Sequence, residues 1–124
     1  MPVHKHLIIR AEVNHPPMTE KYIRLWLRKL VRKIDMNIIK GPYASYVSEK
    51  GNRGVTGMVM IETSHIAIHV WDEELPALVQ CDVYSCAEFS SNEVLAEFVS
   101  MDVVKIDHIL LDRKTSIREN FSYT

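Results

Sequence analysis

The most informative segment of the chain is Gly54-Val55-Thr56-Gly57-Met58-Val59-Met60-Ile61-Glu62-Thr63-Ser64-His65-Ile66-Ala67-Ile68-His69-Val70-Trp71-Asp72-Glu73. Its two apolar runs, Val55–Ile61 and Ile66–Trp71, have the length and the β-branched content of strands. Thr63, Ser64 and His65 lie between them, where a turn is expected. The segment therefore predicts a β-hairpin with polar residues at its turn.

Further strands and two helices are predicted on either side of this hairpin. Residues 4–14 alternate in polarity, and three more segments have strand character: Tyr43–Val47, Ala77–Tyr84 and Val103–Leu111. Thr19 is placed to cap a helix whose apolar residues recur at helical spacing, namely Ile23, Trp26, Leu27, Leu30, Val31 and Ile34. Asn92–Met101 is a second helix candidate, with Val94, Leu95, Phe98 and Val99 on one face. The polar tail from Asp112 is expected to be loosely held.

The resulting order, β-α-β-β-β-β-α-β, predicts an α+β fold in one domain, residues 1–124. Two helices cannot cover both faces of so wide a sheet, so we expect a two-layer sandwich with a mainly antiparallel sheet and its helices on one face. The other face must then be covered by a partner or stay exposed. A symmetric homodimer is the simplest expectation.

Composition excludes several classes of protein. The formal net charge is -1, and no apolar run approaches the roughly 18 residues of a membrane span. The N-terminus lacks the apolar core of a secretory signal, so a cytoplasmic protein is expected, with no membrane partner. One face of the first helix is basic, but nucleic-acid binding is not expected from a chain that is not basic as a whole. Cys81 and Cys86 predict neither a disulfide nor a zinc site.

Three interpretations of the polar hairpin residues remain open. The simplest is a structural turn. A metal site would use His65 and His69, which lie on one strand face, but no third ligand is evident nearby, and we expect no metal. A nucleophilic pair would use Ser64 and His69, which point to opposite faces of a regular strand, so the chain would have to turn or bulge near residues 63–65.

The segment also resembles a known family, the prokaryotic S-adenosylmethionine decarboxylases. Their signature runs roughly G-V-S-G, a short apolar strand, E-S-H-x-x-I-H-T-W-P-E and later F-T-C-G. The matching stretches are Gly54-Val55-Thr56-Gly57, Thr63-Ser64-His65-Ile66-Ala67-Ile68-His69-Val70-Trp71-Asp72-Glu73 and Val83-Tyr84-Ser85-Cys86. The resemblance covers about residues 4–112.

This resemblance implies a cofactor made from the chain itself. Ser64 would attack the carbonyl of Thr63, and cleavage would leave a β chain, residues 1–63, and an α chain, residues 64–124, that begins with a pyruvoyl group. That group would bind an amino-acid-type substrate as a Schiff base and act as an electron sink. The catalytic residues implied are Ser64, His69 and Thr56 for processing and Cys86 as proton donor, with Glu73 and His65 in supporting positions.

The chain departs from the family at several positions, and Thr56 occupies the place of its processing serine. Thr63 replaces a glutamate, Asp72 a proline and Ala87 a glycine, and Lys50 falls where many members carry an aromatic residue that stacks on adenine. The expected function is decarboxylation of S-adenosylmethionine for spermidine biosynthesis. Two alternatives stay open: a pyruvoyl-dependent decarboxylase of arginine or ornithine, and an unprocessed, catalytically silent homologue that binds or regulates a partner.

Overall fold

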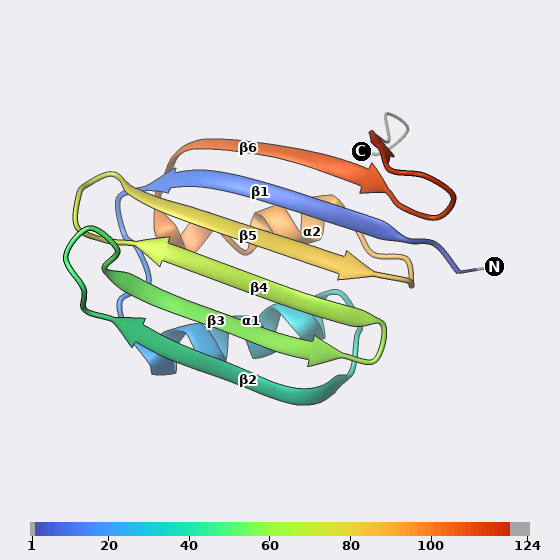
Figure 1. Cartoon of the computed structure of the whole chain (residues 1–124), viewed down its shortest axis with the longest axis horizontal. Coiled ribbons are helices and arrows are strands. Elements are labelled where there is room, and N and C mark those ends of the chain that lie inside the picture. The colour runs from blue at the N-terminus through green and yellow to red at the C-terminus, as the bar shows by residue number, and fades with distance from the viewer. Residues whose placement is uncertain (1, 120–124) are drawn as a thin grey trace.

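A seven-stranded antiparallel sheet with its helices on one face forms the computed structural model, which describes residues 2–119 (Figure 1). The strand order is β2-β3-β4-β5-β1-β6-β7. The elements are β1 (Lys5–Val13), α1 (Glu20–Lys33), β2 (Ile38–Val47), β3 (Gly54–Ile61), β4 (Ser64–Trp71), β5 (Ala77–Ser85), α2 (Ser91–Ala96), the 3-10 turn η1 (Val99–Met101), β6 (Val103–Asp112) and β7 (Arg118–Glu119). The predicted α+β two-layer fold is confirmed.

The predicted hairpin is formed by β3 and β4, which only Glu62 and Thr63 connect. The two strands pair in unbroken register from Ile61 opposite Ser64 to Thr56 opposite His69. On the other side β4 pairs with β5, again without a shift in register. Both edges of β4 are therefore hydrogen-bonded along its length, and its first paired residue is Ser64.

Helix α1 begins and packs as its sequence predicts. The Thr19 side chain accepts a hydrogen bond from the Tyr22 N–H (3.1 Å), which satisfies one of the free donors of the first turn. Its apolar face is buried against β2 and β3 through Ile23, Trp26, Leu27, Leu30 and Val31. A Cβ on Gly57 would lie 2.2 Å from Ile23 Cγ2, so this close packing requires a glycine in β3.

The second helical segment is shorter than predicted. Helix α2 ends at Ala96, and the chain continues as the 3-10 turn η1. Val94 and Phe98 are buried as expected, but Val99 is 81% exposed. The prediction for Val99 was wrong because a 3-10 turn advances each residue further around the axis than an α-helix does and so shifts the apolar stripe.

The C-terminal segment is more ordered than its polarity predicts. Strand β7 pairs with β6 through Leu111 opposite Glu119 and Asp112 opposite Arg118. The Asp112 carboxylate also accepts the Lys114 N–H (2.9 Å). The expectation of a loosely held tail is therefore wrong as far as residue 119, because backbone pairing needs no apolar side chains. Residues 120–124 lie outside the described part of the chain.

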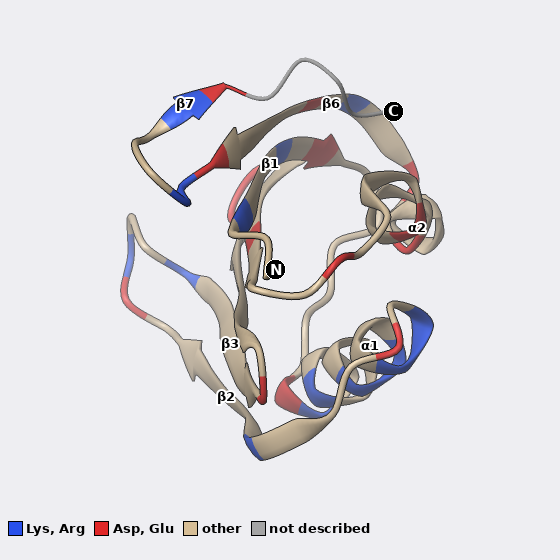
Figure 2. Cartoon of the chain, turned by 90° about the vertical axis from the view of Figure 1, so that its right-hand side faces the viewer, with Lys and Arg blue, Asp and Glu red and all other residues tan. Residues whose placement is uncertain are grey.

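The helices cover one face of the curved sheet and leave the other open (Figure 2). Strand alternation places polar and apolar side chains together on the open face, where Tyr43, Met58, Met60 and Ile8 are between 39% and 58% exposed. None of the helices formed by the described residues has the length and apolar character to span a bilayer.

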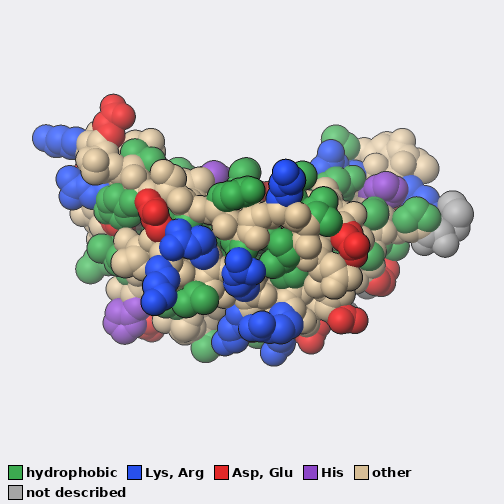
Figure 3. Space-filling model, turned by 90° about the horizontal axis from the view of Figure 1, so that it is seen from below, with side chains coloured by type: hydrophobic (Ala, Val, Ile, Leu, Met, Phe, Trp, Pro, Cys, Tyr) green, Lys and Arg blue, Asp and Glu red, His purple; other side chains and the backbone are tan. Residues whose placement is uncertain are grey.

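The basic face of α1 is on the outside of the molecule. Lys and Arg side chains gather on the side where α1 and β2 lie (Figure 3). Arg24 and Lys29 have acidic neighbours, Glu20 at 3.9 Å and Glu97 at 3.6 Å, as is usual for a solvated surface. That this face binds no nucleic acid stays a prediction.

Gly54, the first residue of β3, is expected to tolerate no side chain. Its φ is +149°, and a Cβ there would lie 1.8 Å from the Val70 carbonyl oxygen. We expect Gly54→Ala to lower the free energy of unfolding by about 3 kcal/mol, because both the backbone conformation and the close approach of β4 are lost. Urea denaturation followed by circular dichroism measures this change.

Gly51→Ala is the matched control. Gly51 also has a positive φ (+87°), but a Cβ there meets nothing within 4 Å. The control should cost only the conformational strain, about 1–2 kcal/mol. Equal losses in the two variants would show that the contact with Val70 does not limit residue 54.

Candidate active site

The bond between Thr63 and Ser64 lies in a strained turn. Ser64 has a φ of +147°, a conformation that residues other than glycine rarely adopt. The Thr63 carbonyl oxygen accepts a hydrogen bond from the Cys86 backbone N–H (2.9 Å), and the preceding residue, Glu62, donates its N–H to the Asn37 carbonyl (2.9 Å). The peptide is thus held on both sides, with a donor already directed at its carbonyl oxygen.

Cys86 reaches this turn because β5 ends one residue before it. Ser64 is paired with Ser85, so the loop that follows β5 lies beside the turn that precedes β4. Cys86 is half-buried in this loop, whereas Cys81 lies within β5 and is buried, and burial raises the pKa of the Cys81 thiol well above its usual range. Cys86 thus lies outside β5, and the two cysteines have different environments.

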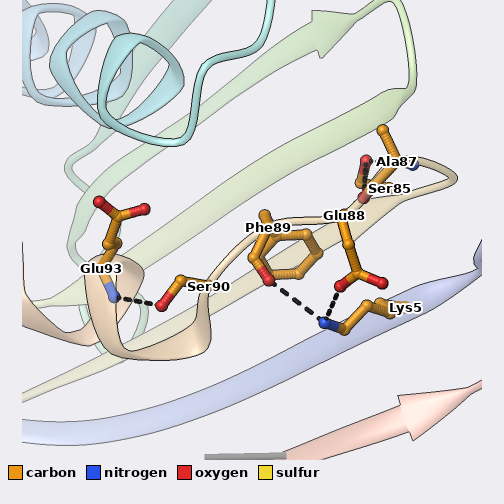
Figure 4. Close-up of polar contacts among 7 residues, drawn as sticks. All are labelled: Lys5, Ser85, Ala87, Glu88, Phe89, Ser90 and Glu93. Carbon is orange, nitrogen blue, oxygen red and sulfur yellow. Dashed lines mark hydrogen bonds and ion pairs between the residues drawn. The ribbon is translucent and has the colours of Figure 1, made fainter.

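The loop that carries Cys86 is held at several points (Figure 4). The Lys5 ammonium group from β1 contacts the Glu88 carboxylate and donates to the Phe89 carbonyl (3.2 Å). Ser90 caps α2 by accepting the Glu93 N–H (3.3 Å). These contacts tie residues 86–90 to β1 and α2 and so fix the position of the Cys86 amide.

Thr56 and His69 lie together, away from Ser64. They are paired across β3 and β4, and Thr56 Oγ1 is 3.4 Å from His69 Nδ1. His69 lines a shallow pocket of about 410 Å³ on the open face, with His6, Ile8, Ile9, Arg10, Gln80, Cys81 and Asp82. Five residues of extended strand, about 16 Å, separate His69 from Ser64.

The chain turns at Glu62 and Thr63, as one of the two expected departures from a regular strand, but β4 has no bulge, and the turn does not bring Ser64 to His69. Strand β4 is in regular register from Ser64 onward, and only the turn before Ser64 departs from extended geometry. The structure therefore brings Ser64 together with Thr63 and Cys86, and Thr56 together with His69. It does not bring the two groups together within one chain.

Glu73 lies just beyond the far end of β4 from Ser64. Its carboxylate accepts the Gly51 N–H (2.8 Å) and the Arg53 N–H (3.3 Å), and these hydrogen bonds lower the pKa of the Glu73 carboxyl group. A second pocket of about 400 Å³ is found there, lined by Gly51, Trp71, Glu73, Glu74, Pro76 and Leu78. In this chain Glu73 thus holds the loop that contains Lys50 and does not contact the Thr63–Ser64 turn.

His65 is part of a cluster that the sequence did not reveal. The carboxylate oxygen Oδ2 of Asp82 contacts Nε2 of His65 at 2.9 Å and Nε2 of His6 at 2.8 Å. Burial alone would raise the pKa of Asp82, but the hydrogen bonds from His6 and His65 outweigh it and hold this pKa below its usual value. The three residues lie on the open face of the adjacent strands β4, β5 and β1. The alternation of polar and apolar residues shows which face a side chain is on, but it does not show which strands are neighbours.

This cluster has the residue types of a metal site, but its hydrogen bonds point to a different role. Its three ligand atoms lie within 4.8 Å of one another, and His69 is not among them. Arg113 Nη1 lies 3.2 Å from His6 Nδ1. A guanidinium group only donates, so Nδ1 accepts and the proton of His6 is on Nε2, facing Asp82. A metal ion at Nε2 would need that position free of its proton, so the arrangement favours a hydrogen-bonded network.

Comparison with known proteins identifies relatives over most of the chain. The sequence model of the S-adenosylmethionine decarboxylase family matches residues 10–119. An S-adenosylmethionine decarboxylase proenzyme of Clostridium botulinum (strain Langeland) is 31% identical over 77 residues, 61% of each chain. The corresponding proenzyme of Archaeoglobus fulgidus is 31% identical over 74 residues, which cover 60% of this chain and 61% of the relative. These matches span less than two thirds of the relatives' length.

A solved structure shares the fold over nearly its whole length. The adenosylmethionine decarboxylase from Aquifex aeolicus superposes with a TM-score of 0.67 and 22% identity, covering 99% of this chain and 98% of that one. At this identity the likeness establishes the architecture.

The Asp82 cluster makes stability depend on pH. A carboxyl group whose pKa is lower in the folded than in the unfolded chain stabilises the fold above its unfolded pKa of about 4, and this contribution is lost as the pH falls through the lowered value. We expect Asp82→Asn to lower the free energy of unfolding by about 1–2 kcal/mol at pH 7. Urea denaturation from pH 7 to pH 3 should show the difference from wild type closing below about pH 4.

Asp107→Asn is the control, because the Asp107 carboxylate is exposed and its ion pair with Lys105 is long at 3.8 Å. It should change stability little at any pH. A loss at Asp107 as large as that at Asp82, or a difference at Asp82 that stays constant to pH 3, would contradict the assignment.

Proposed function

This chain belongs to the S-adenosylmethionine decarboxylase family, and on that premise we propose that it is a proenzyme that cuts itself between Thr63 and Ser64. The observation that carries the proposal is the turn itself. Ser64 is held at a φ of +147°, and the Thr63 carbonyl, where negative charge would develop, already accepts the Cys86 N–H at 2.9 Å. A strained peptide and a preorganised donor are what attack by the neighbouring hydroxyl requires.

The proposed reaction begins with a shift of the acyl group. The Ser64 hydroxyl oxygen bonds to the Thr63 carbonyl carbon, the bond from that carbon to the Ser64 nitrogen breaks, and the hydroxyl proton passes to the nitrogen, which leaves an ester. Loss of the Ser64 α-proton then breaks the Cβ–O bond, releases Thr63 as a carboxylate and leaves dehydroalanine. One water hydrolyses the imine tautomer of dehydroalanine to ammonia and a pyruvoyl group.

The surrounding residues fit a pyruvoyl group at position 64. Strand β4 is paired with β3 and β5 along its length, so the hydrogen bonds from His65 onward would still hold residue 64 in place after the chain is cut. A pyruvoyl group held there would supply the electron sink that decarboxylation of an amino-acid-type substrate needs. The half-buried thiol of Cys86, in the loop beside the turn, is the proton donor we assign to the product.

S-adenosylmethionine is the proposed substrate, and the decarboxylated product would serve spermidine synthesis. The relatives from Clostridium botulinum and Archaeoglobus fulgidus support this substrate by their names. Lys50 lies exposed in the loop that Glu73 holds. The adenine of the substrate would therefore meet a lysine here, where many members of the family carry an aromatic residue. Two unpaired cysteines fit a cytoplasmic protein.

Intact-mass measurement tests the cleavage. Wild-type protein incubated near neutral pH should change from one species of 14.4 kDa into two fragments broken between residues 63 and 64. Ser64→Ala should remain whole, because its side chain has no nucleophile. Carbon dioxide release from carboxyl-labelled S-adenosylmethionine, arginine and ornithine then identifies the substrate. A wild-type chain that stays whole and releases no carbon dioxide would support the silent, partner-binding alternative.

The two cysteines provide an internal control for the same assay. Cys86→Ala should still be cut, since its backbone N–H remains, but should lose decarboxylation. Cys81→Ala should lose stability at most, because Cys81 is buried within β5. Loss of turnover in Cys81→Ala but not in Cys86→Ala would show that the cysteines are assigned the wrong way round.

We also propose that a second copy of the chain completes the site. His69, the processing base implied by the resemblance, lies about 16 Å along β4 from Ser64 and beside Thr56. A regular strand cannot bend to join them. The open sheet face, with exposed Met58, Met60, Ile8 and Tyr43, offers apolar area for a symmetric contact. Such a homodimer would supply Thr56 and His69 of one protomer to Ser64 of its partner.

Mixing two inactive variants tests this arrangement. Ser64→Ala and His69→Ala should each fail to cleave, or cleave slowly, when expressed alone. Co-expressed, they should form a mixed dimer in which Ser64 of one chain meets His69 of the other, and the His69→Ala chain should be cut in up to about half of the molecules. Masses distinguish the two chains. No cleavage in a mixed dimer that size-exclusion chromatography shows to form would mean that the two groups act within one chain or not at all.

A further inference from the structure

The Ser85 hydroxyl is buried beside the Thr63–Ser64 bond. Ser85 is the last residue of β5 and is 0% exposed. Its Oγ lies 2.9 Å from Thr63 Oγ1, 2.9 Å from the Ala87 nitrogen and 3.0 Å from the Ala87 carbonyl oxygen, and 4.0 Å from Met36 Sδ. One hydroxyl group therefore contacts both the residue whose carbonyl is attacked and the loop that provides the donor to that carbonyl.

The contact with Ala87 shapes the turn around Cys86. Ser85 Oγ accepts the Ala87 N–H (Figure 4), which closes a tight side-chain-to-backbone turn over the intervening residue. Within this turn the Cys86 N–H points at the Thr63 carbonyl oxygen, 2.9 Å away. The direction of the oxyanion donor thus depends on a hydrogen bond made by its neighbour.

The contact with Thr63 fixes the residue that donates the acyl group. Ser85 Oγ–H donates to Thr63 Oγ1, and Thr63 Oγ1–H points to Met36 Sδ at 3.3 Å. The threonine hydroxyl is therefore held from two sides, which restricts rotation of residue 63 and of its carbonyl. A side chain without a hydroxyl at position 63 would lose both contacts.

We propose that Ser85 is a positioning residue for chain cleavage, acting through the Thr63 side chain and the Cys86 amide to align the scissile carbonyl with its donor. This inference rests on the proposed self-cleavage. A purely structural serine would make the same hydrogen bonds and contribute only to stability, so the test must separate the rate of acyl transfer from folding.

Four single variants and one double variant make that separation. Ser85→Ala and Thr63→Val should each slow cleavage about tenfold or more, the rate equivalent of about one net hydrogen bond, whereas Thr63→Ser, which keeps the hydroxyl, should cleave close to the wild-type rate. In a Thr63→Val background, Ser85→Ala should slow cleavage by a smaller factor than it does in wild type, because one of its two contacts is already gone. Thr19→Ala, which removes the cap of α1 and is no part of the site, is the control and should cleave at the wild-type rate.

Hydroxylamine provides a readout of the step itself. It cuts an ester but not an amide, so it releases residues 1–63 as a hydroxamate only after the acyl shift. Cleavage of Ser85→Ala should stay slow in hydroxylamine, because the ester is what forms slowly. Two results would overturn the inference and leave the proposed function intact. In the first, the wild-type chain cleaves and Ser85→Ala cleaves at the same rate. In the second, hydroxylamine restores the cleavage rate of Ser85→Ala to that of wild type.

Two further outcomes are also decisive. Failure of the wild-type chain to cleave, with or without hydroxylamine, overturns the proposed function and this inference with it. If circular dichroism shows Ser85→Ala to be unfolded, the Thr63→Val and Thr63→Ser pair decides. Equal rates in that pair overturn the role of the Ser85–Thr63 contact, and a slow valine variant beside a fast serine variant supports it.

Discussion

Continuous pairing of β4 with β3 and β5 is the constraint from which the site follows. This pairing starts at Ser64, so the strained residue is the point where an irregular turn becomes a regular ladder. The same register sets Ser85 opposite Ser64 and thereby places the Cys86 amide beside the Thr63 carbonyl. It also sets His69 opposite Thr56, at a distance from Ser64 that a regular strand cannot shorten. The pairing of β4 therefore brings Thr63, Ser64 and Cys86 together and keeps Thr56 and His69 away from them.

Packing on the helix side keeps this ladder in place. Gly57 allows Ile23 of α1 to approach β3, and Gly54 allows the backbone of β4 to approach the start of β3. Both glycines belong to the Gly54-Val55-Thr56-Gly57 stretch. Close packing therefore explains why glycine is needed at these two positions, whatever reaction the chain performs. Thr56, between them, is the member of that stretch whose side chain lies next to His69.

The sequence predicted most of the fold because its long elements have clear periodicity. Helix α1 and the strands β1, β3, β4, β5 and β6 all have apolar residues at the spacing their geometry demands. Strand β7 was missed because two polar residues, Arg118 and Glu119, carry no such pattern, and the end of α2 was missed because a 3-10 turn changes the spacing. Thr63, Ser64 and Cys86 were found through the resemblance, and the structure brings them together. The cluster of His6, His65 and Asp82 was not found, because β1 enters the sheet beside β5, far from it in sequence.

That position of β1 would determine how the two fragments of a cut chain hold together and refold. A cut after Thr63 would leave β1, α1, β2 and β3 on one fragment and β4, β5, α2, β6 and β7 on the other, yet β1 lies between β5 and β6. The fragments would be interleaved and would come apart only if several rows of backbone hydrogen bonds broke together. Before the cut, folding is an event within one chain. Afterwards, refolding from the denatured state would require two fragments to associate, so its rate would depend on protein concentration. The cut protein would therefore owe its structure to folding that took place before cleavage.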